Sequence, residues 1–214
     1  MWRCSHVTDL VRRTGWIVLR PWGVPRFHHS GQSHFVTFCC YHRRRLLTTD
    51  ESRRIFESAL ERVRRSFRLQ VYGYVVMPEH VHLLLSEPQQ DTLADVLKSL
   101  KQGVSRRLIG KLPLKPKPGL SGAPDHFWQK RYYDFNIRNY PQFVEKLRYI
   151  HRNPVKAGLC ELPEDWQWSS FRHYATGLEG RVEIESEWTA RKRERAAGRL
   201  GPAVEPPHSS QNQA

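Results

Sequence analysis

Cysteine is scarce in this sequence, with four residues in 214, at positions 4, 39, 40 and 160. None of them forms a C-x-x-C pair, so neither a disulfide framework nor a zinc site is predicted, and the thiols are expected to be reduced and structural. Long apolar runs are also missing: Trp16 to Leu19 falls far short of the roughly 20 residues that span a bilayer. Charged residues at positions 3, 9, 12 and 13 interrupt any secretory signal. We therefore expect a cytoplasmic protein that does not enter a membrane.

Acidic residues are too few to balance the basic ones. The chain has 21 Asp and Glu against 35 Lys and Arg, which gives a formal net charge of +14 and a pI near 10.1. Such a surface concentrates polyanions, so nucleic acid is the leading class of partner and a membrane surface is the competing one. A hydrophobic share of 39% is typical of a soluble chain with one core. The composition thus predicts one nucleic-acid-binding domain with tails.

The hydrophobic pattern alternates between strand and helix periods along the chain. Strand patterns cover residues 35–41, 71–77, 80–86 and 126–137. Helical patterns follow a possible capping box at Thr48 and Glu51, follow Asp91 up to Gly110, and run from Pro141 to Pro154. The order β-α-β-β-α-β-α predicts a ferredoxin-like α+β sandwich, with a four-stranded antiparallel sheet and helices on one face. The last helix is expected to lie beside the sheet as a C-terminal catalytic helix.

Segments without periodicity divide the chain. Residues 1–25 are predicted to be a poorly ordered N-terminal extension, and residues 26–175 the folded domain. Residues 176–214 are predicted to be a basic, mostly disordered tail, because Gly, Pro, Ser and Gln dominate its end. The Pro- and Gly-rich stretch 111–125 is predicted to be a loop. Irregularly spaced histidines near the first strand are interpreted as solvated loop residues rather than metal ligands: His28, His29 and His34.

Two histidines in the third predicted strand are the first candidates for chemistry. His80 and His82 flank Val81, so their imidazoles point to one face of the sheet while Val81 points to the other. Two neutral imidazoles on one face form a bidentate metal site. The alternative is that the two histidines occur together by chance on the solvent-exposed face of a sheet, because two residues alone do not make a catalytic centre.

The last helix offers groups that complete such a site. Tyr149 and Asn153 are spaced i and i+4 and share one helical face. At about 100° per residue, the tyrosine lies roughly 125° and the asparagine roughly 85° from the apolar stripe, so Tyr149 is not needed in the core. If this face meets the histidines, Asn153 adds an oxygen ligand. Imidazole and oxygen ligands together suit Mg²⁺ or Mn²⁺. The stripe itself consists of Phe143, Leu147 and Ile150.

This arrangement predicts an enzyme that cuts and rejoins DNA. The phenol of Tyr149 would attack a phosphodiester polarised by the metal, forming a 5′-phosphotyrosyl link and releasing a 3′-OH. Because the covalent link conserves the phosphodiester, strands can be rejoined without ATP. The alternative interpretation is a boundary tyrosine that packs its ring on a neighbour.

Basic and aromatic residues are interleaved between residues 126 and 157. Basic side chains track phosphates while aromatic rings stack on unpaired bases, so this segment is a candidate surface for single-stranded DNA. For any one residue, a solvated helix face or a strand core is the alternative. The candidate DNA-binding residues are Trp128, Lys130, Arg131, Tyr132, Tyr133, Arg138, Arg148 and Arg152.

Four motifs follow in order: Met77-Pro-Glu-His-Val-His-Leu-Leu-Leu85, Phe127-Trp-Gln-Lys-Arg-Tyr-Tyr-Asp134, Tyr149-Ile-His-Arg-Asn-Pro-Val-Lys-Ala-Gly-Leu159 and Glu164-Asp-Trp-Gln-Trp-Ser-Ser-Phe171. Together they resemble the REP-associated tyrosine transposases, a branch of the single-tyrosine HUH transposases of insertion-sequence type. The resemblance implies a ferredoxin-like HUH endonuclease fold and metal-dependent cleavage and joining of single-stranded DNA at hairpins of repeated elements. By position, it implies that His80 and His82 are the HUH pair, Tyr149 the nucleophile and Asn153 the third ligand.

Three other functions share some of these features. A HUH relaxase or replication initiator uses the same chemistry but usually has a third histidine ligand and a larger chain. A non-catalytic RRM-type module shares the strand order and charge, but carries stacking aromatics in its third strand, where His80 and His82 stand here. An inactive, domesticated transposase is disfavoured by the intact His, His, Tyr and Asn set. The sequence leaves open whether the protein is a monomer or a homodimer.

Overall fold

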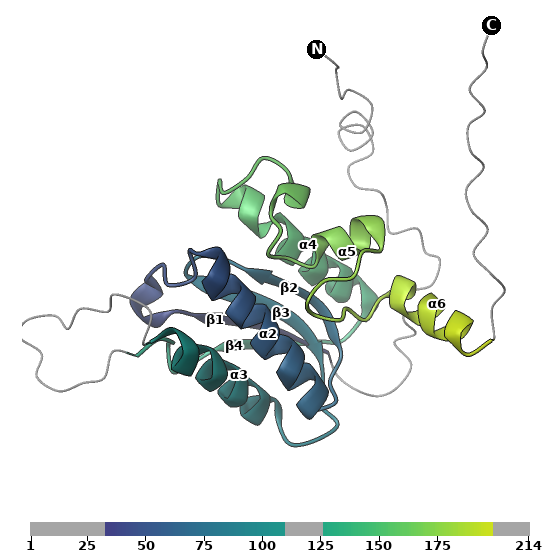
Figure 1. Cartoon of the computed structure of the whole chain (residues 1–214), viewed down its shortest axis with the longest axis horizontal. Helices are drawn as coiled ribbons and strands as arrows, with labels where there is room; N and C mark the ends of the chain where they lie inside the picture. The colour runs from purple at the N-terminus through teal and green to yellow at the C-terminus, as the bar shows by residue number, and fades with distance from the viewer. Residues whose placement is uncertain (1–32, 110–125, 199–214) are drawn as a thin grey trace, which may run out of the picture.

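The computed structural model describes residues 33–109 and 126–198 (Figure 1). The predicted N-terminal extension 1–25, the predicted loop 111–125 and the tail beyond residue 198 lie outside these residues, as do His28 and His29. Among the helices that the structure describes, none combines the length and the apolar character that a membrane span requires.

Four antiparallel strands form one sheet: β1 (Ser33–Cys39), β2 (Val71–Val76), β3 (His80–Ser86) and β4 (Tyr133–Ile137). Their order across the sheet is β2-β3-β1-β4. This is the order of a ferredoxin-like α+β sandwich, so the predicted fold is confirmed. Helices cover both faces of the sheet, which is why β3 is buried along almost its whole length.

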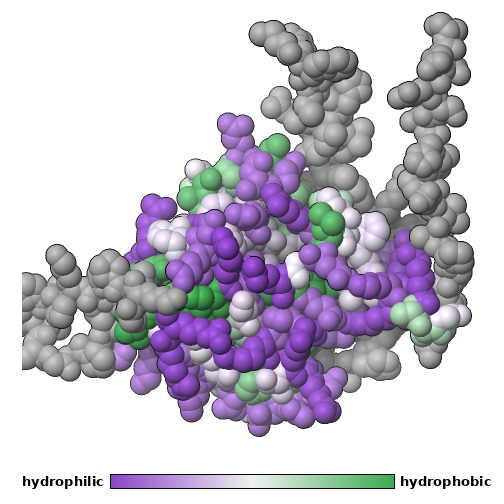
Figure 2. Space-filling view, viewed as in Figure 1, coloured by the Kyte–Doolittle hydropathy of each residue, from purple (hydrophilic) through white to green (hydrophobic). Residues whose placement is uncertain are grey.

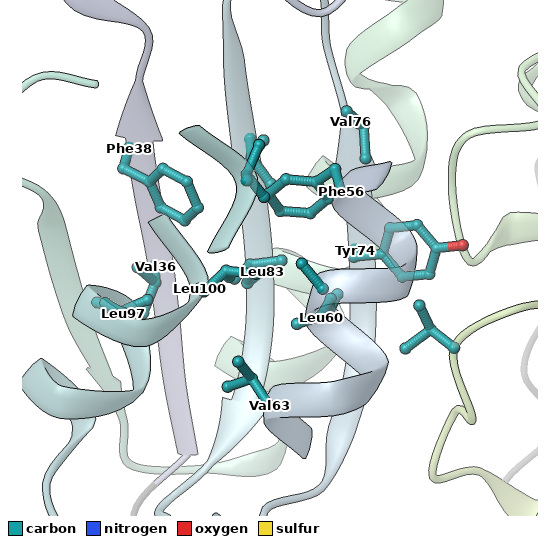
Figure 3. Close-up of a cluster of buried hydrophobic side chains, with 14 of the residues drawn as sticks. Val36, Phe38, Phe56, Leu60, Val63, Tyr74, Val76, Leu83, Leu97 and Leu100 are labelled. Carbon is teal, nitrogen blue, oxygen red and sulfur yellow. The ribbon is translucent and has the colours of Figure 1, made fainter. Parts of the chain in front are cut away.

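Helices α2 (Asp50–Ser66) and α3 (Leu93–Leu108) lie side by side on one face of the sheet (Figure 1). Their apolar stripes meet the strand residues that point to this face and form the larger of two cores (Figure 3). The outer surfaces of the two helices are hydrophilic, as Figure 2 shows. The centre of this core contains Phe38, Phe56, Leu60, Leu83, Leu97 and Leu100.

The N-caps of both helices differ by one residue from the predicted ones. Thr49, not Thr48, accepts a hydrogen bond from the backbone of α2, and Thr92, not Asp91, forms a capping box with Asp95 at the start of α3. Asp91 instead has a φ of 60°, the left-handed conformation that short polar side chains tolerate.

Helix α4 (Tyr140–Lys156) packs on the opposite face of the sheet, over a smaller core that includes Phe35 and Leu84. The prediction that the last helix lies beside the sheet is therefore corrected, because its apolar stripe covers the face that α2 and α3 leave open. Gly73 permits this close approach, since a Cβ there would lie 2.6 Å from Cδ1 of Leu147. The predicted stripe of Phe143, Leu147 and Ile150 is buried as expected.

The end of α4 also differs from the prediction. The helix begins with Pro141 in its first turn, as expected, but it continues through Pro154 to Lys156. Pro154 lies in the last turn, where its missing N–H removes one hydrogen bond without interrupting a longer helix. Gly158, with a φ of 66°, follows the helix and turns the chain away.

The fourth strand is shorter than the predicted range of 126–137. Residues 126–132 do not form a strand with β1, and Trp128 contributes only an isolated bridge to Cys40. The aromatic residues that suggested a strand in this segment reflect core packing instead, because Phe127 and Trp128 are both buried in the larger core.

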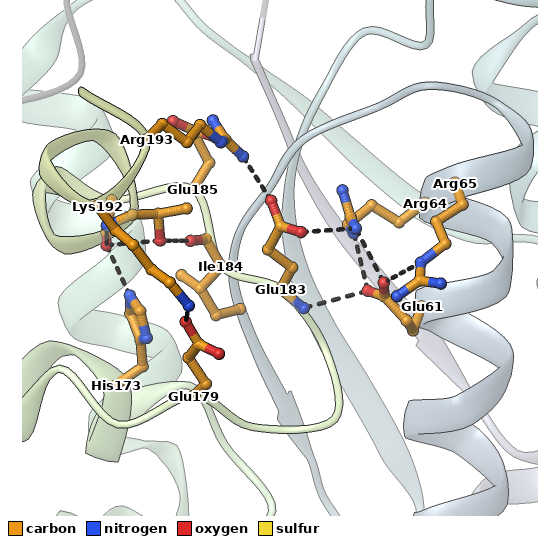
Figure 4. A network of polar contacts seen from close by, with 12 residues as sticks. Glu61, Arg64, Arg65, His173, Glu179, Glu183, Ile184, Glu185, Lys192 and Arg193 are labelled. Carbon is orange, nitrogen blue, oxygen red and sulfur yellow. Dashed lines mark hydrogen bonds and ion pairs between the residues drawn. The ribbon is translucent and has the colours of Figure 1, made fainter. Parts of the chain in front are cut away.

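The segment after α4 covers the free edge of β2. It contains the 3-10 helix η2 (Pro163–Asp165) and the short helices α5 (Phe171–Thr176) and α6 (Glu187–Ala196). The predicted disorder of residues 176–214 is wrong for residues 176–198, because Val182 and Ile184 are buried in the larger core. Figure 4 shows the polar network at this contact, in which Arg64 of α2 pairs with Glu183 of the segment. Arg64 also pairs with Glu61 within α2, and Arg193 pairs with Glu183 and Glu185 within the segment.

Candidate active site

The pleat of β3 places His80 and His82 together on the sheet face that α4 covers. Their Nε2 atoms are 3.0 Å apart and their ring centroids 4.7 Å. Both side chains are buried, with 8% and 4% of their surfaces exposed. The two imidazoles therefore converge on one point at the end of the sheet where β3 begins.

The second nitrogen of each imidazole has a polar partner. Nδ1 of His80 lies 2.8 Å from a carboxylate oxygen of Glu79, and Nδ1 of His82 lies 2.7 Å from the hydroxyl oxygen of Thr37 on β1. A carboxylate only accepts hydrogen bonds, so the proton of His80 belongs on Nδ1. With the same tautomer at His82, two Nε2 lone pairs face each other, and a cation between them would relieve their repulsion.

Burial keeps both imidazoles neutral. Removal from water lowers the pKa of His82 to about 3, with smaller contributions from its electrostatic interactions with His80 and Arg43. Burial also lowers the pKa of His80, although the carboxylate of Glu79 opposes this shift. At pH 7 both rings are therefore in the neutral form that binds metal ions.

Helix α4 brings Asn153 and Tyr149 to the histidines. The amide nitrogen of Asn153 lies 3.1 Å from Nε2 of His82, and rotation of the amide would direct its carbonyl oxygen to the same place. One turn earlier, the ring of Tyr149 lies 5.1 Å from the ring of His82 and 5.8 Å from that of Phe35. Tyr149 is 38% exposed, whereas Asn153 is 9% exposed. The site thus combines buried donor groups with a phenol that solvent reaches.

The donor set fits a divalent metal cation. Two imidazoles and one amide oxygen can bind such a cation and leave positions open for other ligands. Adjacent corners of an octahedron with metal–ligand distances of about 2.1 Å are about 3.0 Å apart, and the two Nε2 atoms have this separation. In the described part of the chain, no three His, Cys, Asp or Glu side chains gather as a metal site. A third protein ligand here would therefore be Asn153.

Seven of the eight candidate DNA-binding residues are exposed. Tyr133 is 55% exposed, and its ring lies 6.4 Å from that of Phe35, the residue that also contacts Tyr149. It is therefore the candidate aromatic that the structure places beside the site. The exposed residues are Lys130, Arg131, Tyr132, Tyr133, Arg138, Arg148 and Arg152.

Trp128 is the exception, and its burial does not support the prediction that it binds DNA. Its side chain is buried in the larger core, where its ring packs 5.1 Å from Phe38. Its Nε1 donates a hydrogen bond to the carbonyl oxygen of Lys101 at 2.9 Å. A buried ring whose donor is also engaged offers no face on which a base could stack.

Sequence reasoning missed the two residues that orient the histidines. Glu79 directly precedes His80 and was recognisable as a carboxylate next to a ligand. Thr37 carried no signal, because its contact with His82 depends on the register between β1 and β3, in which these two residues are paired.

Comparisons with known proteins converge on one family. The sequence matches the family model "Transposase IS200 like" over residues 28–153. It is 29% identical over 154 residues to the REP-associated tyrosine transposase of Escherichia coli K12, covering 72% of this chain and 85% of that protein. A 50-residue segment is 46% identical to the ISDra2 transposase TnpA of Deinococcus radiodurans, covering 23% and 36% of the two chains. A solved REP-associated tyrosine transposase bound to a REP hairpin superposes with a TM-score of 0.56 and 26% identity, covering 75% of this chain and 90% of that one.

Proposed function

Because this chain belongs to the IS200-like transposase family, we propose that it cleaves and rejoins single-stranded DNA through a covalent phosphotyrosine intermediate. The observation that carries the proposal is the convergence of Tyr149 and Asn153 from α4 on the neutral pair His80 and His82. A nucleophile beside a divalent-metal site is the arrangement that phosphodiester transfer requires.

Tyr149 is the nucleophile in the proposed reaction. Its phenolic oxygen bonds to phosphorus while the bond from phosphorus to the 3′ oxygen breaks, which leaves a 5′-phosphotyrosyl link. The phenol loses its proton to solvent and the departing 3′ oxygen takes one up. Attack by a different 3′-OH reverses these steps and frees the tyrosine. One phosphoester bond forms for each one that breaks, so no ATP is needed.

His80, His82 and Asn153 are the residues that would hold Mg²⁺ or Mn²⁺, whose contribution would be Lewis-acid polarisation of a non-bridging phosphate oxygen. The chain's own residues prepare this site before any substrate arrives. The carboxylate of Glu79 sets the tautomer of His80, and the hydroxyl of Thr37 can accept the Nδ1–H of the metal-binding tautomer of His82. The packing of α4 fixes the place of Tyr149.

The proposed substrate is single-stranded DNA that contains hairpins. One solved structure of a similar protein is that of a transposase bound to a REP hairpin, and the exposed basic residues of this chain suit a polyanion. We expect the exposed ring of Tyr133 to stack on an unpaired base near the scissile bond. A paired duplex offers no such base. Neutralising several phosphates should make binding fall with salt at a slope of about 0.7 per contact for single strands.

The direct test is formation of a covalent adduct with a hairpin oligonucleotide that has single-stranded flanks, in the presence of Mn²⁺. Wild-type protein should form the adduct, and Tyr149→Phe should bind the same DNA without forming it. His82→Ala should abolish the adduct, whereas Asn153→Ala should only weaken it, because water replaces an oxygen ligand more easily than an imidazole. Adduct from the Phe variant would refute the assignment of the nucleophile. Equal cleavage of the fully paired duplex would refute the single-strand preference.

An RRM-type binding module is disfavoured by the position of α4. Such modules stack bases on an open sheet face, but here α4 covers the face that carries His80 and His82, and Phe35 on that face is 5% exposed. Loss of hairpin binding on mutation of Phe35 to a smaller apolar residue, with the fold retained and no covalent adduct formed by the wild-type protein, would instead favour the RRM-type function.

A further inference from the structure

Lys156 lies beside the proposed nucleophile. It is the last residue of α4, seven residues after Tyr149. At about 100° per residue, these two side chains and that of Asn153 fall within about 60° of one another around the helix. The ammonium nitrogen of Lys156 is 5.6 Å from the centroid of the Tyr149 ring. One helical face thus carries the nucleophile, a candidate metal ligand and a cation.

Within the residues that the structure describes, the charge of Lys156 has no acidic partner. In the described residues, 33–109 and 126–198, its contact is with the ring of Tyr149 and it forms no ion pair. Lys146 on the same helix is different, because its ammonium lies 3.0 Å from the carboxylate of Glu145. Lys156 is also exposed. It therefore presents an uncompensated positive charge where a phosphate would meet Tyr149.

We propose that Lys156 is a catalytic residue whose ammonium group binds a non-bridging oxygen of the scissile phosphate. The inference rests on the proposed function, in which Tyr149 attacks that phosphate. As the tyrosine oxygen bonds to phosphorus and the 3′ oxygen departs, negative charge concentrates on the phosphate oxygens. The ammonium donates a hydrogen bond to this charge and keeps its proton throughout, so no bond to Lys156 forms or breaks.

The end of a helix offers a simpler role for a lysine. A cation in the last turn interacts favourably with the helix dipole, and this role affects stability without affecting the reaction. Arg107 provides a matched comparison, because it is an exposed cation in the last turn of α3, on the opposite face of the sheet. The two roles are separable, since only a phosphate contact makes the reaction rate depend on Lys156.

The experiment compares Lys156→Gln, Lys156→Arg and Arg107→Gln. The rate of adduct formation is measured in a single turnover with saturating hairpin DNA and Mn²⁺. The Kd for the same DNA is measured in a Tyr149→Phe background, and melting temperature reports stability. We expect Lys156→Gln to slow the reaction at least about tenfold while Kd changes by less than about threefold. Lys156→Arg should restore most of the rate, and Arg107→Gln should leave it unchanged.

Several results would overturn the inference. An unchanged rate in Lys156→Gln, with or without a lower melting temperature, would leave only the helix-end role. A rate loss that saturating DNA removes would make Lys156 a general DNA contact, and failure of arginine to restore the rate would show that charge is not the cause. These results are distinct from failure of the proposed function, which would show as adduct formation by Tyr149→Phe with Lys156 intact.

Discussion

Replacing Thr37 with valine should weaken metal binding without unfolding the protein. Valine keeps the shape of threonine but removes the hydroxyl that lies 2.7 Å from Nδ1 of His82. His82 is 4% exposed, so water has little access to replace that partner. A buried N–H without an acceptor costs about 1–3 kcal/mol. In the wild type the hydroxyl can accept the Nδ1–H of the metal-binding tautomer, whereas in the valine variant that tautomer bears this cost. The imidazole of the variant therefore keeps its proton on Nε2.

The alternative tautomer is accommodated in the metal-free site. A proton on Nε2 of His82 can be donated to Nε2 of His80, which lies 3.0 Å away. The same proton occupies the lone pair that a metal ion needs. Binding must then reverse the tautomer, and loss of such an orienting partner typically lowers metal affinity about 10- to 100-fold. This corresponds to about 1.4 to 2.8 kcal/mol.

Calorimetric titration with Mn²⁺ measures this effect directly. Thr37→Val should bind Mn²⁺ at least about tenfold more weakly than wild type, and its adduct formation should recover at high Mn²⁺. Thr37→Ser, which keeps the hydroxyl, is the matched control and should bind nearly as well as wild type. Wild-type Mn²⁺ affinity in the valine variant would refute the argument that Thr37 stabilises the metal-binding tautomer of His82.

Other predictions concern packing and assembly. Trp128→Ala should lower the free energy of unfolding, measured by denaturant titration, by about 3–5 kcal/mol, because this ring is a core residue. The hairpin affinity of the folded variant should be unchanged. A mixture of Tyr149→Phe and His82→Ala should form no adduct, because the ring of Tyr149 lies beside His82 of its own chain; adduct formation would show that subunits exchange their tyrosines. Ile184→Ala should destabilise the fold by about 2–5 kcal/mol, whereas Glu183→Gln should cost less than about 1 kcal/mol, because its ion pairs are at the surface. Similar losses in both variants would show that ion pairs hold the segment after α5.

The fold was predictable where burial and backbone pairing coincide. The sequence predicts β3 residue for residue, because Pro78 and Glu79 separate it from β2 and both of its faces are covered. It places the start of the fourth strand too early, because Phe127 and Trp128 fill the core from a segment that does not pair along β1. The composition of residues 176–214 also led to the prediction of disorder for residues 176–198, which are ordered. Among many charged residues, Val182 and Ile184 are enough to bury that segment against the larger core.

In the site, contacts within one helix or strand could be predicted from the sequence, whereas contacts between elements could not. Spacing within a strand or a helix is local, so His80 with His82 and Tyr149 with Asn153 can be grouped from the sequence alone. The contact between Thr37 and His82 joins residues 45 positions apart and depends on the register of β1 against β3. A slip of one residue in that register would turn the threonine to the other face of the sheet. The metal affinity of Thr37→Val therefore tests the architecture of the site more strictly than the removal of a histidine does. Any arrangement that uses His82 as a ligand predicts that its removal weakens metal binding, whereas only this strand register predicts the effect of Thr37.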